Sequence, residues 1–312
     1  MTLDRGRSTG RRPWRSGWAT LFLVAFGVAA CNAGAGSAAP PPVPAVQYGN
    51  LTVDGVVRSY RVFAPPTSGP RPRSALIVVL HGGAATISDA VSTTGFDQVA
   101  TDHNLIVAYP QGTHGEWNAG FCCGTAPSRM VDDIGFLDAL LDRLEADYPV
   151  DPTRVFLTGV SNGAMMAYRF ACTHAQRVTA VASVAGSMVL NDCTPSRPLS
   201  ILELHGTADP EVPYQGGEAD IGVLATFQYP SSPALAARWA TLDGCASQPA
   251  TTMVGPLTTA TWGDCHAGTT VSLVSVNGGG HVWFAPGLGT ADGAIDATAA
   301  IWRFFSTLHS MP

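Results

Sequence analysis

The sequence predicts one doubly wound α/β domain built around a mostly parallel β-sheet. Two observations lead to this prediction. Short, wholly apolar runs recur along the 312 residues, and segments with helical spacing alternate with them. Runs this apolar are typical of parallel strands that helices cover on both faces.

The apolar runs locate the expected strands, which are 75–80, 105–108, 155–158, 178–184, 199–204 and 271–276. Residues 47–65 differ, because polar and apolar side chains alternate around the turn dipeptide Asp54-Gly55. This pattern predicts a β-hairpin ahead of the first buried strand.

Helical spacing is clearest over residues 132–148, where apolar side chains recur every three or four positions. The acidic residues Asp132 and Asp133 suit the start of this helix and a brace for the preceding loop. Further helices are expected over 164–172, 233–242 and 294–308. The Gly- and Pro-rich stretch 210–232 predicts a short mobile flap beside the functional site.

The N-terminus resembles an export signal. Five Arg lie in the first fifteen residues, and an uncharged apolar run follows over 18–30, too short for a comfortable membrane span. Small residues before Cys31 favour a lipoprotein-type signal in which this cysteine carries a lipid. The alternative is an ordinary signal peptide cut between Ala33 and Ala39. We therefore predict a signal over 1–30, a flexible tether over 31–46 and one domain over 47–312, outside the cytoplasm.

The charge excludes one class of partner. Residues 1–30 hold five Arg and one acidic residue, so the remaining chain has 12 Arg against 22 acidic side chains, a formal charge of −10. Such a chain lacks the basic surface that neutralises phosphates, and we expect no nucleic-acid binding. We expect a monomer whose only membrane contact is the lipid on Cys31.

Export also accounts for the cysteines. Apart from Cys31 there are six, an even number that predicts disulfides in an oxidising compartment. Proximity favours Cys245–Cys265 first and Cys172–Cys193 second. Cys122 and Cys123 would then pair with each other under strain, so the alternative wirings stay open. The chain has no C-x-x-C and no paired-histidine spacing, and we expect no metal and no cofactor.

The run Gly159-Val160-Ser161-Asn162-Gly163 matches the pattern G-x-S-x-G. In this motif a serine sits on a strained turn between a strand and a helix, and small flanking residues let the backbones approach closely. Here an expected strand precedes the run and an expected helix follows it. Ser161 is therefore a candidate nucleophile, against the alternative of a tight turn without chemistry.

A serine hydroxyl needs a base to take its proton, and the base needs an orienting carboxylate. Asp209 follows the strand 199–204, and His281 follows the strand 271–276. Carboxyl ends of parallel strands meet at one edge of a sheet, so these residues are expected near Ser161 as a Ser-Asp-His triad. Without that chemistry, Asp209 would be a turn residue and His281 a packed loop histidine.

Acyl transfer also needs two N–H groups that face the developing oxyanion. The residue after the nucleophile, Asn162, is expected to supply one of them. The loop His81-Gly82-Gly83 follows the strand 75–80, and Gly83 is expected to supply the other. We interpret His81 as a brace for this loop.

Together these motifs resemble the polyhydroxybutyrate depolymerase-like and feruloyl esterase-like secreted esterases, and especially actinobacterial lipoprotein members. The resemblance covers about residues 47–308. It rests on the runs 81–83, 117–124 and 131–136, the Ser161 motif, 205–209 with 212–214, and 279–283. It implies an α/β-hydrolase catalytic domain over 47–312 that hydrolyses carboxylic esters without a cofactor. The same resemblance implies Ser161, Asp209 and His281 as the triad.

Aromatic residues on the loops beside these motifs are candidate substrate contacts, with loop packing as the alternative for each. They are Trp117, Phe121, Tyr214 and Trp283. Hydroxyalkanoate, feruloyl, acetyl and small aryl esters all stay open as substrates, and we lean towards soluble or short oligomeric ones. The functional alternatives are a peptidase or acyltransferase on the same scaffold and a surface-binding lipoprotein without activity.

Overall fold

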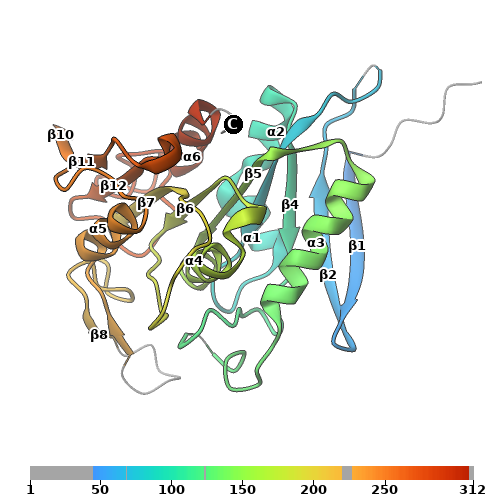
Figure 1. The fold of residues 1–312 in the computed structure, drawn as a ribbon, viewed down its shortest axis with the longest axis horizontal. Coiled ribbons are helices and arrows are strands. Elements are labelled where there is room, and N and C mark those ends of the chain that lie inside the picture. Colours follow the sequence, from blue (N-terminus) through green and yellow to red (C-terminus); the bar gives the residue numbers. More distant parts are fainter. Residues whose placement is uncertain (1–44, 68, 123, 220–226, 309–312) are drawn as a thin grey trace, which may run out of the picture. The chain divides into compact units, whose positions relative to one another are not determined.

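The computed structural model describes residues 45–67, 69–122, 124–219 and 227–308. The predicted signal, Cys31 and nearly all of the predicted tether lie outside the described residues, as does part of the predicted flap. The described chain forms a ten-stranded sheet with helices on its two faces (Figure 1). This architecture confirms the predicted α/β class.

The centre of the sheet is parallel. Its strands, in spatial order, are β4 (Ile106–Pro110), β3 (Ser74–Leu80), β5 (Val150–Val160), β6 (Ala180–Val184), β7 (Ser200–Gly206) and β12 (Val271–Val276). Antiparallel strands flank it: β1 (Val46–Val53) and β2 (Val56–Phe63) beside β4, and β11 (Leu257–Trp262) and β10 (Ala250–Val254) beside β12.

Helices cover both faces because side chains of the central strands alternate between two apolar cores. On β3, Leu76 and Val78 pack towards α3 (Asp133–Asp147), α4 (Asn162–His174) and α5 (Ser232–Leu242). Ile77 and Val79 of the same strand pack towards α1 (Ile87–Thr94), α2 (Phe96–His103) and α6 (Ala297–Thr307). Each predicted strand and helix is confirmed, with shifts of a few residues at its ends.

Four larger elements were missed. Helices α1 and α2 are short and polar, and α1 begins at a capping box that Thr86 forms with Asp89 rather than at an apolar repeat. Strand β10 is exposed at every position, and β11 is half-buried over most of its length. Neither strand carries the buried pattern on which the sequence prediction depended.

Smaller elements complete the described chain. They are the short strands β8 (Gly217–Ala219) and β9 (Phe227–Tyr229) and the 3-10 turns Ala175–Arg177 and His266–Gly268. Strands β8 and β9 pair with each other inside the segment predicted as a flap.

The two favoured disulfides are confirmed. Cys172 bonds to Cys193, and Cys245 bonds to Cys265. Cys122 is also disulfide-bonded, while Cys123 lies outside the described residues. Bonds of this kind persist in oxidising compartments, which agrees with the predicted export.

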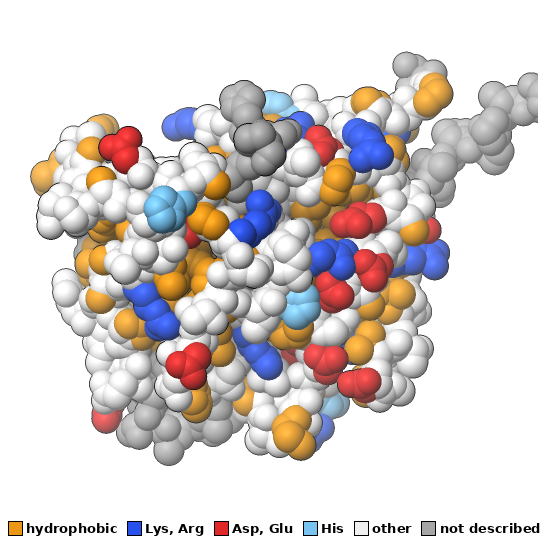
Figure 2. Space-filling view, in the orientation of Figure 1, with side chains coloured by type: hydrophobic (Ala, Val, Ile, Leu, Met, Phe, Trp, Pro, Cys, Tyr) orange, Lys and Arg blue, Asp and Glu red, His pale blue; other side chains and the backbone are white. Residues whose placement is uncertain are grey.

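Charged side chains of both signs are interspersed on the face drawn in Figure 2. Arg177 shows the pattern, because its guanidinium lies 2.7 Å from Asp138, 2.8 Å from Asp142 and 3.6 Å from Glu145. Within the described ranges, no helix is long and apolar enough to cross a bilayer. The same ranges hold no group of three or more His, Cys, Asp or Glu side chains placed to bind a metal ion.

Candidate active site

The candidate site begins where the strand order reverses. Strand β4 follows β3 in the chain and lies on one side of it, whereas β5, the next strand, lies on the other side. Crevices outside the carboxyl ends of strands at such a switch point are where α/β sheets bind ligands. The loop 81–83 leaves the end of β3 and Ser161 leaves the end of β5, so both lie at this point.

Ser161 occupies a strained turn between β5 and α4. Its backbone angles are φ 53° and ψ −124°, a region that L-residues rarely adopt. The Ser161 N–H donates to the Val184 carbonyl at 3.0 Å, and the Ser161 carbonyl accepts the N–H of Met165 at 3.0 Å. These bonds hold a conformation of the kind that active sites retain.

The flanking glycines allow this turn because neither position has room for a side chain. A Cβ on Gly159 would lie 2.7 Å from the carbonyl carbon of Gly163 and 2.8 Å from the Leu80 oxygen. A Cβ on Gly163 would lie 2.3 Å from the His81 oxygen and 2.4 Å from that of Leu80. The first turn of α4 thus packs directly on the backbone at the end of β3.

The loop after β3 runs beside the serine. A Cβ on Gly82 would lie 3.8 Å from the Cβ of Ser161, and a Cβ on Gly83 would lie 3.7 Å from that of Asn162. Both distances are ordinary van der Waals contacts. The two residues predicted to donate N–H groups, Gly83 and Asn162, are therefore neighbours at the start of α4.

His81 braces this loop, as predicted. Its Nε2 accepts the backbone N–H of Gly112 at 2.9 Å and lies 3.0 Å from Nε2 of Gln111. Its Nδ1 lies 2.7 Å from the Gly82 oxygen, so the Nδ1 proton is donated to that carbonyl. Burial lowers the pKa of His81, and the neutral ring acts as a fixed hydrogen-bonding link.

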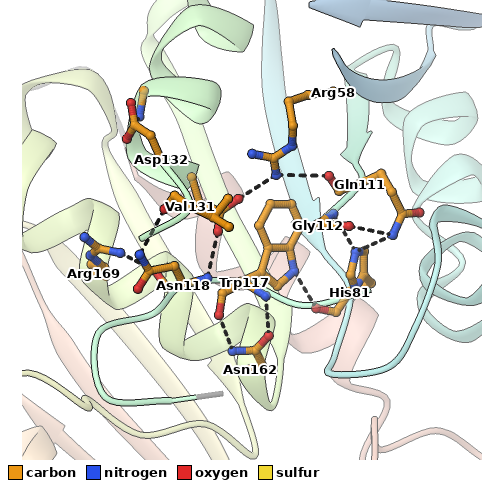
Figure 3. A network of polar contacts seen from close by, with 12 residues as sticks. Arg58, His81, Gln111, Gly112, Trp117, Asn118, Val131, Asp132, Asn162 and Arg169 are labelled. Atoms are coloured by element: carbon orange, nitrogen blue, oxygen red, sulfur yellow. Dashed lines mark hydrogen bonds and ion pairs between the residues drawn. The ribbon is translucent and has the colours of Figure 1, made fainter. Parts of the chain in front are cut away.

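Trp117 and Asn162 clamp the other side of the loop (Figure 3). The Asn162 side chain accepts the Trp117 N–H at 2.7 Å and donates to the Trp117 oxygen at 3.0 Å. The Trp117 indole N–H donates to the His81 oxygen at 3.0 Å. The structure corrects the predicted substrate contact of Trp117, because the residue is 0% exposed and links two loops of the site.

A buried ion pair anchors this clamp. Asp133 accepts the N–H of Asn118 at 2.7 Å and pairs with the Arg58 guanidinium at 2.5 Å. Arg169 also donates to the Asn118 carbonyl. Asp132 caps α3 by accepting the Gly135 N–H at 2.8 Å, so both acidic residues have their predicted structural roles. Sequence reasoning missed Arg58, which lies on β2, 75 residues from its partner.

Asp209 and His281 meet because the loops after β7 and β12 are neighbours. The Ala208 N–H donates to the Gly279 oxygen at 2.9 Å, which joins the two loops. Oδ2 of Asp209 then accepts from Nδ1 of His281 at 2.8 Å. The structure thus brings together two residues that are 72 positions apart in the sequence.

The Asp209 carboxylate is fully buried, yet it stays ionised. Its Oδ1 accepts two backbone N–H groups, from Glu211 and Val212, each at 2.8 Å. Burial on its own would raise the pKa of Asp209, but hydrogen bonds from His205 and His281 outweigh it and hold that pKa well below its usual range. A permanent negative charge therefore faces Nδ1 of His281.

The three remaining residues predicted to contact substrate differ in their exposure to solvent. Trp283 is only 4% exposed and donates to Oγ1 of Thr298 at 3.0 Å, so it packs against α6 instead of facing a substrate. Tyr214 is half-buried, and its hydroxyl lies 2.6 Å from Oγ of Ser275. Phe121 is 47% exposed.

Comparisons with known proteins agree with this architecture. A family model described as phospholipase/carboxylesterase matches residues 129–231. A protein of Nocardia uniformis subsp. tsuyamanensis named as an esterase, NocK, is 29% identical over 86% of this chain and 89% of its own length. Feruloyl esterase C of Emericella nidulans is 28% identical over 91% and 96%.

Other matches are partial or structural. The chain spans 39% of feruloyl esterase B of Piromyces equi, at 28% identity over 66% of this chain. An acetyl xylan esterase from Aspergillus awamori superposes with a TM-score of 0.59 at 16% identity, over 84% of this chain and all of that one. This likeness shows the shared α/β-hydrolase fold.

Gly163→Ala should destabilise the protein even though alanine favours helices over glycine by about 1 kcal/mol. The added Cβ would meet the His81 oxygen at 2.3 Å, so we expect the free energy of unfolding to fall by about 1–3 kcal/mol in urea titrations. Gly263→Ala is the matched control, because a Cβ there meets nothing within 4 Å. Equal stabilities for the two variants would contradict the packing described above.

Asp209→Asn should remove an acid-sensitive part of the stability. The pKa of Asp209 is lower in the folded than in the unfolded chain, so its stabilisation is present above about pH 4 and is lost as the pH falls towards the folded pKa. Urea titrations should show a deficit of about 1–3 kcal/mol near pH 7 that narrows in acid. Asp192→Asn, at an exposed position, should show no such trend; a deficit for Asp209→Asn that widens in acid would oppose the assignment.

Proposed function

We propose that this chain, which is a carboxylic ester hydrolase with the α/β-hydrolase fold and is similar to feruloyl esterases, works through Ser161, His281 and Asp209. The observation that carries the proposal is the 2.8 Å hydrogen bond between Asp209 and His281. This bond lies at the sheet edge that also carries the strained turn of Ser161. Ser161 follows β5, and His281 follows β12, which is the third strand along the sheet from β5.

In the proposed first step, His281 takes the Ser161 proton as the hydroxyl attacks the ester carbonyl. Asp209 accepts the Nδ1 proton of His281, so Nε2 is the basic nitrogen. The buried carboxylate orients the ring and stabilises the imidazolium that forms. The Gly83 and Asn162 amides receive the oxyanion, and the Trp117–Asn162 clamp keeps those donors in place.

In the second step, the tetrahedral intermediate expels the alcohol, which takes its proton from His281. Water then attacks the acyl-enzyme while the same histidine accepts a proton from it, and His281 returns that proton to Oγ of Ser161 as the carboxylic acid leaves. Every proton in this cycle passes through His281, so the cycle needs no cofactor.

The substrate class we propose is short or aryl carboxylic esters, of hydroxyalkanoate, feruloyl or related type. Relatives named as feruloyl esterases support this class. The exposed ring of Phe121 offers an apolar surface for an acyl or phenolic group. Bonded cysteines support action outside the cytoplasm, and a lipid on Cys31 is part of the proposal.

Ser161→Ala should lower kcat/KM for p-nitrophenyl acetate by at least about three orders of magnitude, because the nucleophile is lost while its turn is kept. A fluorophosphonate probe should label the wild type and leave this variant unlabelled. The control is Ser92→Ala, which removes an exposed hydroxyl on α1 and should leave both readouts unchanged. Undiminished turnover in a folded Ser161→Ala protein would refute the assignment.

Substrate choice can be tested by comparing acid release from methyl ferulate, 3-hydroxybutyrate oligomers and p-nitrophenyl acetate. If Phe121 contacts an aryl acyl group, Phe121→Ala should raise KM for methyl ferulate several-fold and leave KM for p-nitrophenyl acetate nearly unchanged. The reason is that only the larger acyl group would lose apolar contact area. Equal effects on the two esters would count against Phe121 as an acyl contact.

A further inference from the structure

Behind Asp209, the interior of the sheet holds two more ionisable side chains. Glu203 and His205 both lie on β7, two positions apart and therefore on the same face of the strand, and both are fully buried. Oε1 of Glu203 lies 3.3 Å from Nδ1 of His205. Nε2 of His205 lies 3.2 Å from Oδ2 of Asp209, the same oxygen that His281 contacts.

The hydrogen-bond partners locate the protons on His205. Its Nε2 lies 2.8 Å from the Val212 oxygen, and a carbonyl only accepts, so Nε2 carries a proton. Its Nδ1 faces Glu203 Oε1 as an ion pair at 3.3 Å, and neither atom has a hydrogen-bond partner among the described residues. A bare nitrogen beside a carboxylate would bury two facing acceptors, so a proton must lie between them.

That proton belongs on His205, because the ring lies between two carboxylates. Burial by itself would lower the pKa of His205, but the adjacent Asp209 and Glu203 carboxylates outweigh it and raise that pKa to about 9. A buried carboxylate in an apolar strand is costly without a cation, and His205 is the cation within reach of Glu203.

We propose that Glu203 holds His205 as a buried imidazolium, and that this cation, by lying against the Asp209 carboxylate, sets the negative potential that His281 meets at Nδ1. The inference rests on the proposed function, in which His281 is the base. Glu203 and His205 are positioning residues here, since they act through Asp209.

The effect on His281 arises because the Asp209 carboxylate contacts two imidazole rings, those of His205 and His281. A cation at Nε2 of His205 offsets part of the negative potential that Asp209 exerts on Nδ1 of His281. The pH dependence of turnover should report this potential, because a general base must be neutral when it takes the proton of the nucleophile.

Other ionisable groups lie around Glu203, His205 and Asp209, and they do not reverse the effect of the His205 cation on the potential at His281. The Tyr168 hydroxyl donates to Glu203 at 3.4 Å, and burial keeps its pKa well above the usual value. Tyr229 faces Asp209, and burial together with that charge raises its pKa to about 12. Tyr214 meets the His205 ring edge-on, and the exposed Glu211 carboxylate lies 3.5 Å from Nε2 of His281.

Glu203→Gln tests the proposal through the pH profile. The amide keeps the shape and can donate to Nδ1 of His205, which then stays neutral with its proton on Nε2. The change removes one anion and one cation, but the cation is nearer to His281, so the negative potential at Nδ1 of His281 should grow. We expect the acid limb of kcat/KM for p-nitrophenyl acetate to move up by about 0.5–1 pH unit. Glu218→Gln, the same substitution at an exposed site, should leave the limb in place.

Nitrogen NMR of the imidazole rings tests the same claim without activity. At pH 7.5 the wild-type protein should show His205 with both ring nitrogens protonated, with the signal assigned by its loss in His205→Gln. Glu203→Gln should convert that ring to the neutral form with the proton on Nε2. A neutral His205 in the wild type would overturn the proposal, even if the variants do not fold.

The two readouts separate this inference from the proposed function. A wild-type protein without esterase activity would refute the function while NMR still decides the state of His205. An acid limb that stays in place or moves down in a folded Glu203→Gln protein would overturn the inference while the esterase assignment stands.

Discussion

The backbone contact between the end of β3 and the first turn of α4 is the constraint on which the candidate site depends. Gly159 and Gly163 permit it, because any side chain at either position would overlap backbone atoms of the neighbouring segment. Once the helix starts this close to the strand, the chain must turn sharply, and Ser161 takes the strained angles. The loop of Gly82 and Gly83 leaves β3 at the same place and therefore lies against the serine and the start of the helix.

Two series of buried polar contacts hold the loops on either side of this backbone contact in place. On one side, the Arg58–Asp133 pair holds Asn118, and the neighbouring Trp117 is clamped to Asn162 and His81 (Figure 3). On the other side, Glu203, His205, Asp209 and His281 form a second chain from the interior of β7 to the site. Charges buried in this way must find partners of opposite sign, so each chain restricts where its loops can lie.

The prediction succeeded where burial is uniform along an element and failed where it is not. Strands such as β3 and β12 are apolar at nearly every position, so their runs were visible without any partner in view. Strand β10 and helix α1 bury few side chains, and their positions depend on a neighbouring strand and on a cap. The predicted substrate contacts of Trp117 and Trp283 failed for a related reason. An aromatic residue on a loop has the same local sequence whether it faces a ligand or the core.

The sequence alone determined the order in which the site's residues leave the sheet. Parallel strands end at a common edge, so the loops that carry Gly83, Ser161, Asp209 and His281 had to gather there whatever the details of packing. Only the tertiary structure decided which charges pair across that edge. Arg58 and Asp133 are 75 residues apart, and Asp209 and His281 are 72 apart. Such pairing depends on how loops from separate strands pack, which local patterns along the chain do not encode.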